Sequence, residues 1–128
     1  MKKIFAFLVL TFILLCVNKV NAQDNNSASV LRHIVIITFK ADAPADSIKV
    51  LDELYSSLSK SSLVKSFEMG VNISTRDTGV VKHVYVTSFA SKEDMDGYRK
   101  IPEYSKLFKV SLPIAGDVTV ADYWANKY

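Results

Sequence analysis

The two histidines of this chain are the side chains best suited to proton transfer near neutral pH, because a free imidazole has a pKa of about 6.5. His33 and His83 each open a run of β-branched and aromatic residues that ends on a phenylalanine, Phe39 in the first run and Phe89 in the second. Such runs are typical of β-strands, in which residues an even number of positions apart share a face. We therefore expect both imidazoles on one side of a sheet, where they could flank a ligand, act as acid and base, or join a metal site.

A metal or cofactor site has no further support in the sequence. The chain has only these two histidines, and no carboxylate accompanies them at ligand spacing. The four glycines are never clustered into a phosphate-binding loop, and no Gly-x-Ser-x-Gly elbow occurs. The sequence thus predicts no bound metal and no cofactor, and it gives no indication of nucleotide chemistry or serine hydrolysis.

Residues 1–22 have the three parts of a secretory signal peptide. A basic start, Met1-Lys2-Lys3, precedes the apolar run Ile4–Val17, and Val20-Asn21-Ala22 supplies the residues before the expected cleavage site. The apolar run is 14 residues long, fewer than the roughly 20 that span a bilayer, so we expect cleavage and no membrane attachment afterwards. The sequence therefore predicts an exported protein, either periplasmic or secreted.

A lipid anchor on Cys16 is the alternative to simple cleavage, although Leu15 stands where that processing requires a small residue. Cys16 is the only cysteine, so the exported part has neither a disulfide nor a thiolate nucleophile. We expect a polar leader at 23–30 and a single domain at 31–128, a length that suits one modest hydrophobic core.

Removal of the signal peptide leaves a chain without net charge. The segment carries three of the 16 Lys and Arg residues and none of the 13 Asp and Glu residues. Without a basic excess, nucleic-acid binding by phosphate neutralisation is not expected, and a hydrophobic fraction of 49% argues against a disordered chain.

Helix signals follow both histidine strands. After the first strand, Pro44 suits an opening turn, and apolar residues then recur at three-and-four spacing from Ile48 to Leu58. After the second, Ser91-Lys92-Glu93-Asp94 resembles a capping box, Met95 and Tyr98 follow, and Pro102 interrupts before a further apolar stripe from Tyr104 to Leu112.

A further strand closes each half of the chain. These strands are predicted at Val64–Ile73 and, after a Gly116-Asp117 turn, at Val118–Trp124, with Gly79 at the joint between the halves. The order strand, helix, strand, twice over, predicts an α+β fold of the ferredoxin-like βαββαβ type. In that fold a four-stranded antiparallel sheet carries its helices on one face.

The predicted sheet is apolar in the middle of both faces, although its helices can cover only one. A second copy packed face to face across a two-fold axis would cover the other face and close an α+β barrel between subunits. We therefore predict a homodimer, with the following interface residues: Ile34, Ile36, Val84, Val86, Val118, Val120 and Trp124.

Several segments together resemble the stress-responsive A/B barrel domain, a family of dimeric α+β barrels. The resemblance runs from about Leu31 to Tyr123 and rests on the order and spacing of these motifs: Leu31-Arg32-His33-Ile34-Val35 with Phe39, Ser66-Phe67-Glu68-Met69-Gly70, His83 with Phe89, the expected helix from Ser91 to Tyr98, Pro102-Glu103-Tyr104 and Val118-Thr119-Val120-Ala121-Asp122-Tyr123. The resemblance implies the fold, the sheet-to-sheet dimer and a pocket between sheet and helices. It implies little about activity, since most members have no assigned reaction.

One plant branch of that family is a cofactor-free polyketide cyclase, whose working residues match this chain unevenly. Its two strand histidines match His33 and His83, and its helix tyrosine matches Tyr98. Its base, a histidine two residues after the proline, falls on Tyr104, and a phenol with a pKa of about 10 is a poor base near pH 7. The match therefore lacks the base of the cyclase, and a cyclase-like reaction in this chain would depend on His33 and His83 as acid and base.

Three functions remain open from the sequence. The first is binding of a small apolar molecule in a pocket formed by these residues: His33, Val35, His83, Tyr85, Tyr98 and Tyr104. The second is a cofactor-free cyclase- or monooxygenase-like enzyme, for which the candidate catalytic residues are His33, His83 and Tyr98. The third is a non-catalytic stability or interaction module with a closed core.

Overall fold

A computed structural model describes residues 29–126 of the chain. The predicted signal peptide at 1–22 and most of the polar leader lie outside these residues. The elements, in chain order, are β1 (Val30–Phe39), α2 (Ala45–Leu58), β2 (Val64–Val71), the short 3-10 helix η1 (Thr75–Asp77), β3 (Lys82–Phe89), α3 (Lys92–Arg99), α4 (Tyr104–Ser111) and β4 (Ala115–Ala125).

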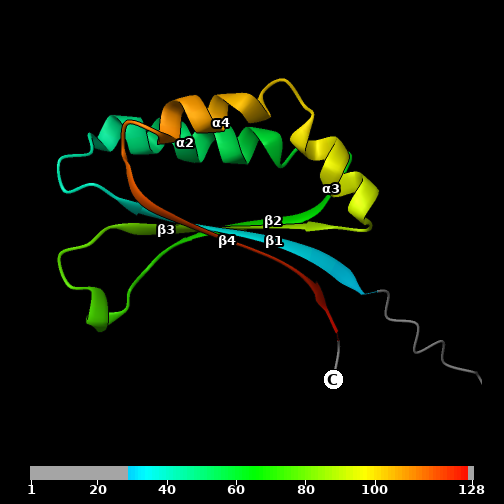
Figure 1. Cartoon of the computed structure of the whole chain (residues 1–128), viewed down its shortest axis with the longest axis horizontal. Helices are drawn as coiled ribbons and strands as arrows, with labels where there is room; N and C mark the ends of the chain where they lie inside the picture. Colours follow the sequence, from blue (N-terminus) through cyan, green and yellow to red (C-terminus); the bar gives the residue numbers. More distant parts are fainter. Residues whose placement is uncertain (1–28, 127–128) are drawn as a thin grey trace, which may run out of the picture.

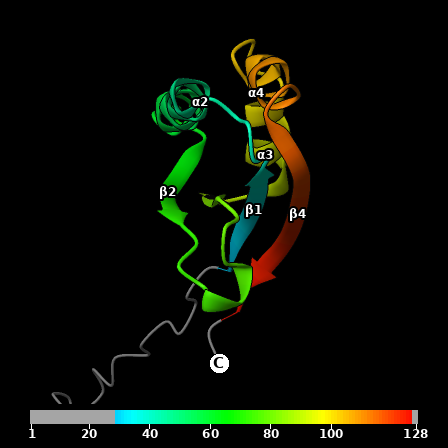
Figure 2. The ribbon, with the colours of Figure 1, turned by 90° about the vertical axis from the view of Figure 1, so that its left-hand side faces the viewer.

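The four strands form one antiparallel sheet in the order β2-β3-β1-β4. The helices α2, α3 and α4 all lie on the same side of it (Figure 1). A view from the end shows α2 and α4 standing side by side over the sheet, with β2 at one edge and β4 at the other (Figure 2). The predicted ferredoxin-like α+β fold with helices on one face is therefore confirmed.

Local sequence signals account for several of the element boundaries. The Ser91 hydroxyl accepts a hydrogen bond from the backbone N–H of Asp94, which caps α3 as the sequence predicts. Pro102 lies in the break between α3 and α4. Gly79 has a φ of 79° in the turn before β3, a conformation that favours glycine.

The predicted turn at Gly116-Asp117 is wrong, because both residues belong to β4. Pairing with β1 continues through Asp117 opposite Thr38 as far as Ala115 opposite Phe39, across a register shift between Thr38 and Phe39. Such an irregularity lets a strand bend while it stays paired. A Cβ atom at Gly116 would meet the Thr38 carbonyl oxygen at 3.4 Å, an ordinary van der Waals contact, so the space at this position does not require glycine.

The hydrophobic core lies between the sheet and the helices. Alternate residues of β1, from Leu31 to Phe39, are buried against them. Helix α2 contributes Leu51, Tyr55 and Leu58, and α3 contributes Met95 and Tyr98. Within residues 29–126, none of the helices is long and apolar enough to span a bilayer.

The face turned away from the helices has an apolar centre. Ile34 pairs with Val86 and Ile36 with Val84, and these four side chains lie on the side opposite the buried β1 residues. Arg32 is exposed at one end of this face, and Lys82 lies at the other.

The placement of Val118, Val120 and Trp124 on this outer face is wrong. They pair with Ile37, Val35 and Leu31, whose side chains point toward the helices, and directly opposed residues of two strands share a face. Alternation along β4 separated its two faces correctly, but only the register with β1 decides which of them faces the helices.

Candidate ligand-binding site

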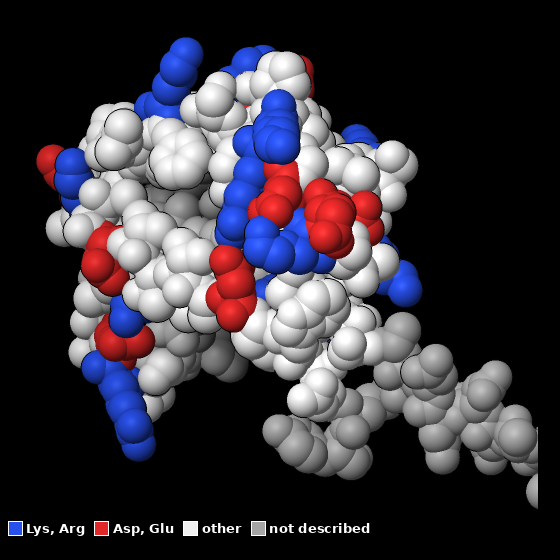
Figure 3. Space-filling view, turned by 45° about the vertical axis from the view of Figure 1, so that its right-hand side comes forward, with Lys and Arg blue, Asp and Glu red and all other residues white. Residues whose placement is uncertain are grey.

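A cavity of about 620 Å³ lies between β1, β4 and α4. Tyr55 of α2 and Arg99 at the end of α3 complete its walls. Its lining residues are His33, Val35, Ile37, Tyr55, Arg99, Tyr104, Leu107, Phe108, Ser111, Leu112, Ala115, Gly116, Asp117, Val118 and Val120. Figure 3 shows a hollow with an uncharged rim, and charged side chains gathered beside it.

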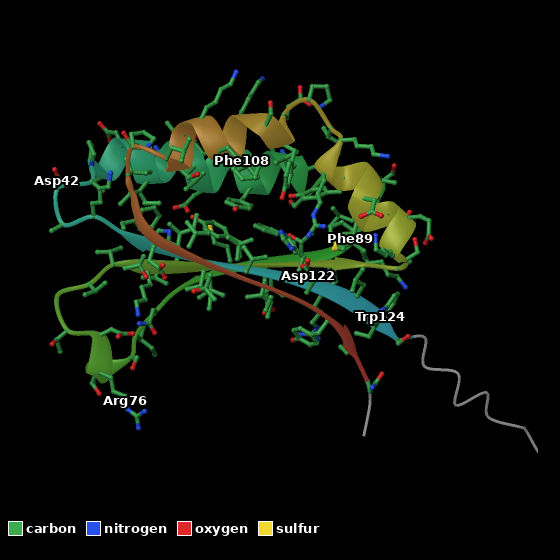
Figure 4. The ribbon with its side chains drawn as sticks, in the orientation of Figure 1. Asp42, Arg76, Phe89, Phe108, Asp122 and Trp124 are labelled. Carbon is green, nitrogen blue, oxygen red and sulfur yellow. The ribbon has the colours of Figure 1, made fainter. Side chains whose placement is uncertain are left out.

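The cavity exists because the helix layer does not close over the edge strand β4. Val118 and Val120 face the helices, yet they are 47% and 53% exposed. On the α4 side, Phe108 and Leu112 are also largely exposed, and Figure 4 shows Phe108 on α4, above the sheet. These four side chains form an apolar rim around the opening.

His33, Asp122 and Arg99 gather at one end of the cavity. His33 on β1 pairs with Asp122 on β4, so the register places the two side chains next to each other on the helix-facing side. The distance from His33 Nδ1 to Asp122 Oδ1 is 2.5 Å, and Arg99 Nη2 donates to Asp122 Oδ2 over 2.7 Å. Figure 4 labels Asp122 on β4 beneath the helix layer.

The hydrogen bond to Asp122 fixes which nitrogen of His33 is free. A carboxylate only accepts, so Nδ1 carries the proton and Nε2 of the neutral ring keeps a lone pair. Nε2 has no hydrogen-bond partner among the described residues. Since none of their side-chain nitrogen or oxygen atoms is both fully buried and without a partner, Nε2 is not fully buried. His33 also lines the cavity, so Nε2 is its available polar atom.

Asp122 is ionised in this arrangement. Partial burial acts to raise the pKa of its carboxyl group, but the hydrogen bonds from His33 and Arg99 outweigh burial and lower it. Arg99 lies in the last turn of α3, where a cation interacts favourably with the helix dipole. The three side chains thus form a connected polar group in an otherwise largely apolar cavity.

A second carboxylate–histidine group lies under α2. Asp52 Oδ1 is 2.9 Å from His83 Nδ1 and accepts a hydrogen bond from the Tyr85 hydroxyl over 2.7 Å. Tyr55 stacks on Tyr85 with ring centroids 3.8 Å apart. Burial and then the hydrogen bond to Asp52 raise the pKa of Tyr85, and burial raises the pKa of Tyr55. Asp52, His83 and Tyr85 tie α2 to the sheet and do not line the cavity, whereas Tyr55 does.

The two histidines share a face of the sheet, but the structure does not bring them together. His33 pairs with Thr87, whereas His83 pairs with Ile37. Ile37 lies four residues after His33 on β1, so the two histidines are separated by roughly 13 Å along the strand. Each histidine is engaged by its own aspartate. An acid–base pair made of both rings across one small ligand is therefore not formed.

Half of the predicted pocket residues line the cavity. His33, Val35 and Tyr104 do, whereas His83, Tyr85 and Tyr98 lie outside the lining. Tyr98 is almost fully buried and packs against Phe89 and Tyr104. Burial, with a smaller contribution from Tyr104, raises the pKa of Tyr98 to about 12. Tyr98 is therefore a core side chain.

Sequence reasoning missed Asp122, Arg99 and Asp52. Asp122 was detectable, because it interrupts the apolar alternation of Val118, Val120 and Trp124 on one side of a strand. Arg99 and Asp52 lie on helices among other charged residues, where nothing in the pattern separates them from solvated ones. Within residues 29–126 no group of three or more potential His, Cys, Asp or Glu ligands is placed to hold a metal ion.

The sheet order, the helix layer and this cavity define a ferredoxin-like α+β protein. The family model described as Stress responsive A/B Barrel Domain matches residues 31–125. The chain belongs to this family, and the resemblance seen in the sequence is confirmed.

Solved structures from three organisms share the fold. A hydroxynitrile lyase from Passiflora edulis has a TM-score of 0.69 and 22% identity over 79% of this chain and 97% of its own. A dimeric ferredoxin-like protein of unknown function from Thermobifida fusca has a TM-score of 0.66 and 14% identity over 77% and 93% of the two chains.

A Dabb family protein from Mesorhizobium loti has a TM-score of 0.63 and 20% identity, covering 77% of this chain and 99% of its own. Among curated proteins, none matches this sequence at a significant level. These likenesses establish a shared fold.

Proposed function

We propose that this protein is a homodimer that binds a small, largely apolar molecule in the cavity between β1, β4 and α4. The observation that carries the proposal is the cavity itself, about 620 Å³ in volume, with apolar walls and polar groups at one end. Sites for small molecules commonly have this size and this distribution of polar groups. A module with a closed core is less well supported, since the layer between β4 and α4 is not filled.

The dimer part of the proposal rests on the uncovered face of the sheet. Ile34, Ile36, Val84 and Val86 form its apolar centre, which a second sheet packed across a two-fold axis would remove from water. The protein from Thermobifida fusca, which has the same fold, is described as dimeric. That description supports a homodimer here.

Native mass spectrometry of the chain purified from its original host tests both parts. We expect a mass of two subunits and one retained small molecule for each. A titration with 2-acetylnaphthalene, a small apolar ketone, then locates binding. Val120→Trp should fill the cavity and abolish binding, whereas Val71→Trp should not. Both valines are half-exposed, lie on edge strands and face the helix side, but only Val120 lines the cavity.

A monomer at micromolar concentration would contradict the dimer. Binding of the ketone that survives Val120→Trp would contradict the cavity as the site.

A second candidate function is acid–base catalysis in the same cavity. The observation that favours it is His33, whose Nδ1 is held by an ionised aspartate while Nε2 remains available. The hydroxynitrile lyase from Passiflora edulis has the same fold. A base at Nε2 would take the hydroxyl proton of a hydroxynitrile as the carbon–carbon bond breaks, giving a carbonyl compound and cyanide.

Cyanide release from 2-hydroxy-2-phenylacetonitrile tests this candidate. Turnover should disappear in His33→Ala and persist in His83→Ala, because His83 does not line the cavity. Absence of turnover in the wild-type protein, or equal turnover in both variants, would remove hydroxynitrile cleavage as its reaction.

Export is the last part of the proposal and rests on the basic start and the 14-residue apolar run Ile4–Val17. Fractionation of cells that express the full chain, followed by N-terminal sequencing, tests it. We expect a mature protein outside the cytoplasm that begins near Gln23. Full-length protein in the cytoplasm would contradict export.

A further inference from the structure

Arg99 is the one positively charged side chain among the residues that line the cavity. A guanidinium in an otherwise apolar pocket ordinarily selects a carboxylate or phosphate, which it can bind through two parallel hydrogen bonds. The surroundings of Arg99 determine whether that expectation holds here.

The charge of Arg99 is already matched inside the protein. Its Nη2 donates to Asp122 Oδ2 over 2.7 Å, and the lowered pKa of Asp122 keeps that carboxylate ionised. Asp117 is also among the lining residues, but it pairs with Thr38 on the outer side of β1 and its carboxylate lies near Thr119, so its charge does not face the helices. Arg99 is thus already paired with an anion of the protein, so an anionic ligand would find no unmatched Lys or Arg side chain among the lining residues.

The hydrogen-bonding groups that remain are suited to an uncharged head. A guanidinium has five N–H groups, of which Asp122 takes one, and Tyr104 lies close enough to interact with another. In the neutral form of the ring, His33 Nε2 presents a lone pair. Together these groups offer donors to a carbonyl oxygen and an acceptor to a hydroxyl group.

We propose that the cavity selects uncharged ligands, apolar molecules that carry a carbonyl or hydroxyl oxygen at the Arg99 and His33 end, and that Asp122 sets this selectivity by neutralising Arg99. The inference rests on the proposed binding function. In this arrangement Arg99 donates a hydrogen bond to the ligand, while its charge is balanced by Asp122 and not by the ligand. Asp122 is a positioning residue, because it acts on the ligand through Arg99 and His33.

Two probes with the same ring test the inference, 2-acetylnaphthalene as the neutral compound and 2-naphthoate as the anion. Isothermal titration at pH 7.5 should give the wild-type protein a preference of at least about tenfold for the ketone. Asp122→Asn leaves Arg99 without its partner, so the ratio of the two affinities should shift toward naphthoate by at least about tenfold.

Asp96→Asn is the matched control. Asp96 is also an acid close to Arg99, but it pairs with Lys92 over 2.6 Å and does not line the cavity. The same loss of one negative charge should therefore leave the affinity ratio unchanged within about twofold, since an exposed charge is screened by solvent and salt.

Arg99→Gln provides a second test that does not depend on the folding of Asp122→Asn. It removes the positive charge and keeps donor N–H groups, so the preference for the ketone should persist. If the wild-type protein instead prefers naphthoate, and Arg99→Gln reverses that preference, the inference is wrong. The proposed binding of a small molecule would still stand in that case. Failure of both probes to bind would overturn the binding function and the inference with it.

Discussion

His33 Nδ1 lies 2.5 Å from Asp122 Oδ1, although 89 positions separate the two residues in the chain. The contact exists because β1 and β4 are neighbours in the sheet and pair in a register that sets His33 opposite Asp122. Arg99 then reaches the other oxygen of the same carboxylate from the end of α3. One aspartate thereby orients an imidazole and neutralises a guanidinium at the same end of the cavity.

The pH dependence of stability should reveal the ionised Asp122. Its pKa is lowered in the folded state, so its contribution is complete above the unfolded value of about 3.9 and is lost as pH falls through the folded value. Asp122→Asn should lower the free energy of unfolding by about 1 kcal/mol above pH 5, an amount reduced by solvent screening at this partly exposed site.

Urea unfolding of both proteins between pH 2 and 7 checks this expectation. The difference between wild type and Asp122→Asn should shrink steadily below about pH 4. A difference that stays constant down to pH 2 would mean that the carboxylate is not stabilised by His33 and Arg99.

The group under α2 should respond differently to the loss of each partner. Asp52→Ala leaves the fully buried Tyr85 hydroxyl and His83 Nδ1 without their acceptor, which should cost about 2–3 kcal/mol of unfolding free energy. Tyr85→Phe removes the donor and leaves Asp52 paired with His83, so it should cost only about 1 kcal/mol. Equal costs in urea denaturation would contradict this account of the group.

Three tyrosines should resist ionisation in the folded protein. Burial raises the pKa of Tyr98 to about 12 and raises the pKa values of Tyr55 and Tyr85 as well. The chain has six tyrosines. At pH 11 the phenolate absorbance of the folded chain should therefore be lower than that of the unfolded chain by nearly the absorbance of three ionised tyrosines. Tyr98→Phe should reduce that shortfall by one, and full ionisation at pH 11 while the fold persists would contradict the burial of these rings.

The apolar centre of the outer sheet face should hold the dimer together. Ile36→Glu places a charge among Ile34, Val84 and Val86, and a buried unpaired carboxylate at an interface is strongly unfavourable. Analytical ultracentrifugation at micromolar concentration should find this variant monomeric. Val50→Glu, on the exposed side of α2, should remain dimeric; a dimeric Ile36→Glu would exclude this face as the interface.

The fold was predictable because its signals are local and repeat in both halves of the chain. Each of these signals depends only on neighbouring residues, and together they specify the order of elements. They are the strand-like runs that begin at His33 and His83, the cap at Ser91 and the break at Pro102. Gly116 and Asp117 were predicted to be a turn because glycine next to aspartate usually marks one. In the structure, pairing across the irregularity at Thr38 overrides that preference.

The site was only partly predictable because it depends on register. Alternation assigns His33 and Val35 to one side of β1, but it does not place Asp122 opposite His33 or move His83 away from it. The same missing information led to the wrong placement of Val118 and Val120. Arg99 reaches the cavity from the last turn of α3 and is held there by Asp122, a contact that no local sequence pattern predicts.

A map of amide chemical-shift changes on addition of 2-acetylnaphthalene tests the central claim, a ligand site between β4 and α4, most directly. We predict that the largest changes fall on Leu107, Val118 and Val120, which line the cavity, and that Met69 and Val71 on the opposite edge strand remain unaffected. Changes confined to β2 or to the outer sheet face, or no saturable changes at all, would contradict the claim.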